Sequence, residues 1–120
     1  MNCIAVAFGG AIGSLLRYIL GLYPIKIFNY NITTILINII GSFAIGLISA
    51  YILKNSTSSF AVNFIKVGLC GGFTTFSTFS LELFDLINKA KFFIGFFYIF
   101  TSVAFSLFAI FFAYKIIGIQ

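Results

Sequence analysis

Histidine and tryptophan are absent from this sequence, and acidic residues are almost absent. The 120 residues contain two acids, Glu82 and Asp85. Without an imidazole there is no Ser–His or Cys–His pair and no histidine metal site. Two carboxylates three residues apart in one segment are a poor general acid–base pair. These absences indicate that the protein is not an enzyme.

Charged residues are scarce as well. They make up 8% of the chain, while hydrophobic residues make up 62%, and a soluble domain carries roughly 25% charged residues. This balance predicts a multi-pass protein of the cell (inner or plasma) membrane, with one domain over residues 1–120. The net charge of +5 comes from scattered basic residues. Since they form no basic stripe, we expect membrane lipid and not nucleic acid as a partner.

Four hydrophobic segments are long enough to cross a bilayer, for which a helix needs about 20 apolar residues. They span residues 4–23, 32–53, 60–86 and 92–117. The first ends at Pro24, and short loops separate the others, so neighbours along the chain run antiparallel. The predicted fold class is therefore an all-α membrane protein with four transmembrane helices.

Basic residues divide almost evenly between the two sides of the membrane. Three fall on the side of the N-terminus and four on the other: Lys54, Lys66 and Lys115, against Arg17, Lys26, Lys89 and Lys91. An excess of Lys and Arg normally sets orientation, so this split permits insertion either way up, and two opposed copies would form an antiparallel dimer. A near-even count also arises by chance in a small protein, so the charges alone leave orientation open.

The first hydrophobic segment carries Gly9, Gly13 and Arg17 at four-residue intervals. The two glycines allow another backbone to approach closely. A guanidinium inside a spanning segment is costly, which leaves two interpretations of Arg17. It is either an anchor that reaches the membrane interface, or a fixed cation in a water-filled vestibule that attracts anions.

Polar and small side chains also form stripes on the second and fourth segments. The second stripe consists of Thr34, Asn38, Ser42, Gly46 and Ala50, and the fourth segment carries Tyr98, Ser102 and Ser106. Taken singly, hydroxyls in membrane helices often bond their own backbone. The Asn38 amide needs partners in hydrocarbon, and it either joins helices or lines a path with its N–H donors. Together the stripes indicate a polar conduit.

The third segment contains the decapeptide GGFTTFSTFS, residues 71–80. Its glycines and hydroxyls predict a helix broken within residues 71–75, which bilayer depth tolerates where protein or water surrounds it; the alternative is a kinked, packed helix. Phe76 and Phe79 share a face and are flanked by hydroxyls. Because the edge of an aromatic ring is electropositive, these rings can meet a small anion while hydroxyl and amide donors replace its water.

Three motifs in this order resemble the Fluc (CrcB-like) fluoride channels. They are GGAIGSLLRY at residues 9–18, NIIGSFAIG at 38–46 and GLCGGFTTFSTFS at 68–80. The resemblance covers essentially the whole chain, and the third motif is the most specific. It implies a passive fluoride-selective channel that exports fluoride and lowers its toxicity in the cytoplasm. It also implies an antiparallel dual-topology homodimer with two pores.

The resemblance further implies a role for individual residues. The fluoride pore would be formed by Phe76, Phe79, Asn38, Ser77, Thr78, Tyr98 and Ser102, with Glu82 beside the polar track. Arg17 would be the vestibule cation. The backbone carbonyls of Gly71 and Thr74 would hold a structural sodium ion on the dimer axis.

Two other functions fit a four-pass chain of this length. A small multidrug exporter needs a membrane-embedded carboxylate for proton coupling, and the first segment has no acid. A non-transporting membrane scaffold explains the small-residue faces. It leaves unexplained the hydroxyls gathered around Phe76 and Phe79.

Overall fold

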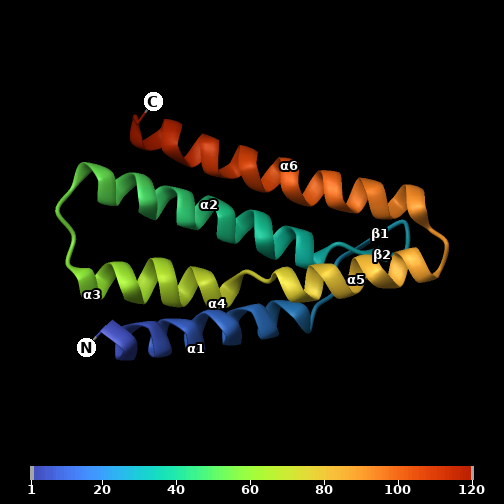
Figure 1. Cartoon of the computed structure of the whole chain (residues 1–120), viewed down its shortest axis with the longest axis horizontal. Helices are drawn as coiled ribbons and strands as arrows, with labels where there is room; N and C mark the ends of the chain where they lie inside the picture. Colours follow the sequence, from blue (N-terminus) through green and yellow to red (C-terminus); the bar gives the residue numbers. More distant parts are fainter. Residues whose placement is uncertain (1, 120) are drawn as a thin grey trace.

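The computed structural model describes residues 2–119 as a bundle of four long segments in which neighbours along the chain run antiparallel (Figure 1). Its longest dimension is 49 Å, which suits a bilayer about 40–45 Å thick with its headgroups. The elements are α1 (Asn2–Gly21), β1 (Lys26–Ile27), β2 (Tyr30–Asn31), α2 (Thr33–Lys54), α3 (Ser59–Val62), η1 (Asn63–Cys70), α4 (Gly71–Phe73), α5 (Phe76–Asn88) and α6 (Phe92–Ile117). The predicted four-pass, all-α fold is confirmed.

Three of the four crossings are single helices. By length and composition, α1, α2 and α6 can each span a membrane. The remaining crossing is assembled from α3, η1, α4 and α5, which follow one line and are interrupted after α4 (Figure 1). The eight residues of η1 form a π-helix, a conformation that the sequence pattern did not indicate.

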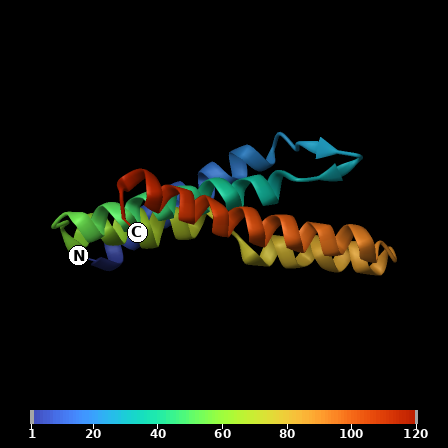
Figure 2. The ribbon, with the colours of Figure 1, turned by 90° about the horizontal axis from the view of Figure 1, so that it is seen from above.

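A short hairpin replaces the turn expected between the first two crossings. Strands β1 and β2 pair antiparallel, with Lys26 opposite Asn31 and Ile27 opposite Tyr30. The two residues at the turn, Phe28 and Asn29, have φ of 49° and 66°, which is the backbone geometry of a type I′ turn. The hairpin stands away from the α5–α6 pair at the end of the bundle opposite both termini (Figures 1 and 2).

Glycine allows α1 to lie directly against the first half of the third crossing. A Cβ added to Gly68 would lie 2.8 Å from the Val6 carbonyl oxygen, and one added to Gly72 would lie 2.6 Å from the Gly10 oxygen. Gly9 and Gly13 face the same seam from α1 and are buried. The expected close approach of two backbones is confirmed, and its partner is η1 and α4.

Replacing Gly68 by alanine is expected to lower the thermal unfolding midpoint of the detergent-solubilised protein, because the new methyl group has no room. Overpacking of this kind costs about 1–3 kcal/mol. Gly10→Ala is the matched control, since its Cβ would lie 3.9 Å from the nearest atom, the Gly68 oxygen. Equal midpoints for the two variants would show that the seam does not need the close approach.

Helices α2 and α6 also meet through small residues. Gly46 and Ala50 of α2 and Ala109 and Ala113 of α6 are all buried. The small-residue end of the predicted α2 stripe therefore packs against α6.

At the end of α6, Gly118 adopts φ 76° and the Ile119 N–H donates to the Tyr114 oxygen. This closes the helix in a Schellman-type turn.

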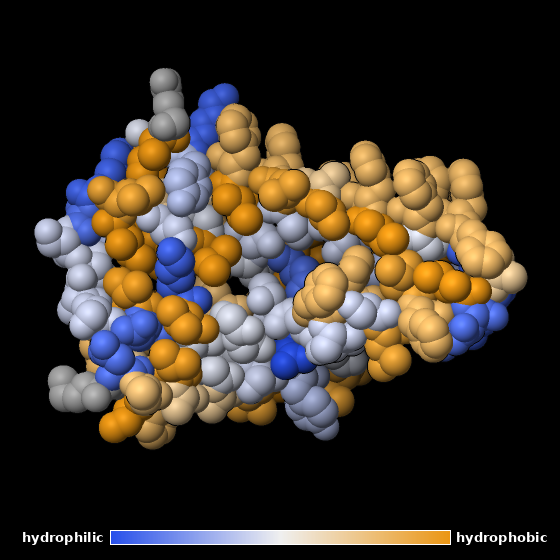
Figure 3. All heavy atoms as spheres, viewed as in Figure 1, coloured by the Kyte–Doolittle hydropathy of each residue, from blue (hydrophilic) through white to orange (hydrophobic). Residues whose placement is uncertain are grey.

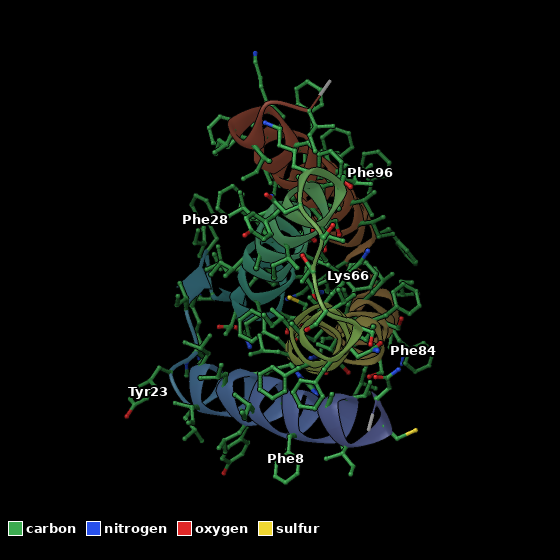
Figure 4. The ribbon with its side chains drawn as sticks, turned by 90° about the vertical axis from the view of Figure 1, so that its left-hand side faces the viewer. Phe8, Tyr23, Phe28, Lys66, Phe84 and Phe96 are labelled. Atoms are coloured by element: carbon green, nitrogen blue, oxygen red, sulfur yellow. The ribbon has the colours of Figure 1, made fainter. Side chains whose placement is uncertain are left out.

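Large apolar side chains cover the outside of the bundle. Phe8, Phe84 and Phe96 are 65%, 59% and 62% exposed and point away from the ribbon (Figure 4). Hydrophobic residues cover much of the α6 edge, while polar residues gather nearer the middle of the same face (Figure 3). Outward apolar and inward polar side chains are the arrangement expected in lipid.

Candidate functional site

The third crossing is interrupted at Thr74 and Thr75, where the backbone is extended. Asn38 of α2 holds this interruption with both ends of its amide. Its Oδ1 accepts from the Thr75 N–H at 2.8 Å, and its Nδ2 donates to the Thr75 oxygen at 2.9 Å. A broken helix at bilayer depth needs such replacement partners. The break lies in the C-terminal part of the expected 71–75 window, beyond the two glycines.

Thr75 connects the two halves of the crossing. It is buried, and its side chain caps α5 by accepting from the Thr78 N–H at 3.2 Å. The same hydroxyl lies 3.2 Å from both Ser77 Oγ and Thr78 Oγ1. Thr75 was predicted only as the end of the window for the break, with no role of its own. The available signal was its position three residues before Thr78, which is the spacing of an N-cap hydroxyl.

A cavity of about 390 Å³ opens beside the break, and we call it the central cavity. Its lining consists of Asn38, Ser42, Ile45, Thr74, Thr75, Phe76, Phe79, Ser102, Val103, Ser106 and Leu107. The structure therefore brings together the two phenylalanines, the α2 amide and the α6 serines, as expected from the stripes. None of these lining residues carries a charged side chain.

Three aromatic rings contact one another in a row beside the central cavity. The Phe76 and Phe79 ring centroids are 5.7 Å apart with planes at 33°, and the Phe79 and Tyr98 centroids are 5.3 Å apart at 21°. Tyr98 thus covers a face of Phe79, which is 8% exposed, whereas Phe76 is 77% exposed. A ring whose face is covered presents its electropositive edge to an ion.

Arg17 turns inward to the break. Its Nε donates to the Gly72 oxygen at 3.2 Å, near the C-terminal end of α4, where the helix dipole favours a cation. Arg17 also lines a second cavity of about 490 Å³ between α1, α2 and α5, which we call the α1 cavity. Thr75, Thr78 and Glu82 lie on the same lining. The structure therefore places Arg17 on the lining of the α1 cavity, in contact with the third crossing.

Glu82 is half-buried and hydrogen-bonded to two other crossings. Thr34 of α2 donates to its Oε1 at 2.9 Å, and the Tyr98 hydroxyl of α6 donates to its Oε2. The carboxylate therefore extends the row of polar side chains on α2 and α6 past Phe79. The sequence placed Glu82 beside the polar track but did not indicate these partners, since a residue's neighbours on other helices depend on packing.

The remaining predicted residues lie at the edge of the break. Ser77 is exposed and lines neither of these cavities. The Thr75 N–H, which would bond the Gly71 oxygen in a continuous helix, bonds Asn38 instead. Within residues 2–119 no group of three His, Cys, Asp or Glu side chains is placed to hold a metal ion. Backbone carbonyls such as that of Gly71 are the cation ligands that the break makes available.

Comparison with known proteins places the whole chain in one family. The family model described as "CrcB-like protein, Camphor Resistance (CrcB)" matches residues 4–114. The chain is 38% identical over 114 residues to the fluoride-specific ion channel FluC of Agrobacterium fabrum, covering 92% of this chain and 91% of that protein. It is 39% identical over 110 residues to that of Ruminiclostridium cellulolyticum, covering 89% and 85%. The chain belongs to the CrcB-like family of fluoride channels.

Proposed function

We propose that this protein is a passive, fluoride-selective channel that lets fluoride leave the cell and so lowers its toxicity in the cytoplasm. Residues 1–120 form a single channel domain. Relatives of nearly the same length are named as fluoride-specific ion channels, and the match extends over 92% of the chain. This membership is also the reason to prefer a channel to a small multidrug exporter, a scaffold or an enzyme.

The central cavity is the observation that supports this function best. Asn38, the α6 serines and the rings of Phe76 and Phe79 line the same cavity, with no carboxylate on the lining. A small, hard anion needs its water replaced by hydrogen-bond donors and electropositive edges, and a carboxylate would repel it. One Nδ2 hydrogen of Asn38 is used on Thr75, which leaves the other for the ion.

The conduction path continues from the central cavity along the polar side chains. Thr75 lines both the central cavity and the α1 cavity, so the two lie on either side of this residue at the break. On the α1 side, Arg17 supplies the fixed positive charge of a vestibule. On the α6 side, Tyr98 and Ser102 extend the track, while Ser77 and Thr78 contribute hydroxyls at the start of α5. The role of Ser77 rests on the family resemblance, because this residue lines neither cavity.

An antiparallel dual-topology homodimer with two pores completes the channel. Gly71 has no atom within 4 Å of an added Cβ, and Phe76 is 77% exposed, so this face has room for a second subunit. Around a two-fold axis, the Gly71 and Thr74 carbonyls of both copies would give four oxygens, which suits a sodium ion. That sodium is structural and is not carried with fluoride.

Reconstituted liposomes test the proposal. With valinomycin carrying potassium, vesicles loaded with potassium fluoride are expected to release fluoride rapidly, and vesicles loaded with potassium chloride are expected to retain chloride. A sodium gradient should not change the fluoride rate. Neither anion moving through verifiably dimeric protein would refute the channel. Fluoride release that scales with the sodium gradient would refute the structural role of sodium.

A further inference from the structure

A third cavity, of about 280 Å³, lies where the hairpin faces the α5–α6 turn, and we call it the hairpin cavity. Asn29, Tyr30 and Asn31 line it on the hairpin side, and Glu82, Lys91 and Tyr98 line it on the other. Figure 2 shows the hairpin standing off from α5 and α6 at this end of the bundle. Glu82 also lines the α1 cavity, so the hairpin cavity and the α1 cavity share this carboxylate.

Of the four charged side chains on this lining, two form a salt bridge with each other. Glu82 bonds two hydroxyls, and Asp85 forms a 2.7 Å salt bridge with Lys89. Within residues 2–119 no second salt bridge is formed, so Glu82 and Lys91 are the two charged groups on the lining outside a salt bridge, and the four charges of the lining sum to zero. The negative charge of Glu82 opposes the entry of an anion, and the ammonium of Lys91 is the nearby group that offsets it.

Lys91 makes contacts through both its backbone and its side chain. Its N–H donates to the Leu86 oxygen at 2.9 Å, and its oxygen accepts from the Gly95 N–H at 2.9 Å. Its Nζ lies 4.9 Å from the centroid of the Tyr30 ring, which is a cation–π contact. Tyr30 in turn is fixed by its place in β2.

We propose that Lys91, held over Tyr30, is the electrostatic collector that raises the local fluoride concentration at the hairpin end of each pore. The inference rests on the proposed channel function. A unit charge within about 7 Å of an ion in water changes its local concentration about threefold at low ionic strength. Dissolved salt screens that effect, since the Debye length falls from about 30 Å at 0.01 M to about 3 Å at 1 M.

Single-channel fluoride currents in planar bilayers test the collector at low fluoride, with and without about 1 M of an impermeant salt. Lys91→Gln is expected to lower the current about threefold in low salt and to match the unsubstituted protein in high salt, because screening removes what the charge contributes. Lys91→Arg should keep the full current. Lys26→Gln, which removes a charge from the hairpin outside the cavity lining, is the matched control and should lower the low-salt current clearly less than Lys91→Gln does.

Two results would overturn the inference. One is a Lys91→Gln current equal to that of Lys26→Gln in low salt. The other is a reduction that persists unchanged in high salt, which would indicate a packing role. Absence of fluoride current in the unsubstituted protein is a separate result, since it would refute the channel itself and the collector with it.

Discussion

Replacing Asn38 by alanine is expected to lower fluoride flux about 100-fold or more. The amide makes two bonds to Thr75, to its N–H at 2.8 Å and to its oxygen at 2.9 Å. Removing it leaves both backbone groups without partners, at a cost of about 1–3 kcal/mol each, and takes a donor from the central cavity. An increase of about 2.7 kcal/mol in the conduction barrier corresponds to the hundredfold decrease in flux. Initial fluoride efflux from liposomes measures it.

Ser42→Ala is the matched control, because Ser42 stands one turn along α2 and lines the same cavity but makes no contact with the break in the described hydrogen bonds. Its flux should stay within about threefold of the unsubstituted rate, a barrier change below 1 kcal/mol. Where the alanine variant does not fold, Asn38→Asp is the substitute. It keeps the acceptor for the Thr75 N–H but replaces the donor with negative charge, and it should block flux. An Asn38 variant that conducts like Ser42→Ala would contradict the role given to the amide.

Replacing Phe79 by isoleucine is expected to lower fluoride flux about 100-fold while the protein stays folded. Isoleucine is apolar and roughly fills the ring's place, but it has no electropositive edge. Phe79 lines the central cavity and stacks on Tyr98 with centroids 5.3 Å apart. Loss of that stacking costs about 0.5–1.5 kcal/mol, so the unfolding midpoint should fall only slightly. Phe76→Ile should reduce flux in the same way.

Phe84→Ile supplies the comparison on the same helix. Phe84 is 59% exposed and points outward (Figure 4), so its replacement should change neither flux nor stability appreciably. Efflux and size-exclusion elution are measured for all three variants. A folded Phe79→Ile dimer that conducts like Phe84→Ile would show that the ring edge does not act on the ion, and it would favour a packing role for the decapeptide.

Sequence reasoning predicted the features that depend on local composition. Four apolar segments can satisfy their backbone only as helices in lipid, and the observed crossings lie within a few residues of those predicted. Intervals of four residues put Thr34, Asn38 and Ser42 on one face of α2, and Tyr98, Ser102 and Ser106 on one face of α6. Because this periodicity is a property of a single helix, the stripes were readable from the chain alone.

Tertiary structure decided where the third crossing breaks. Gly71 and Gly72 have low helix propensity, yet both lie in a helix. Gly72 instead lets the third crossing approach the backbone of α1. The break falls at Thr75, whose N–H finds a better partner in Asn38, 37 residues away. The inward turn of Arg17 has the same origin, because its acceptor on Gly72 is 55 residues distant. The sequence alone shows which polar groups need hydrogen-bond partners in lipid. Helix packing determines what those partners are, because a hydrogen bond between helices depends on the distance between segments far apart in the chain.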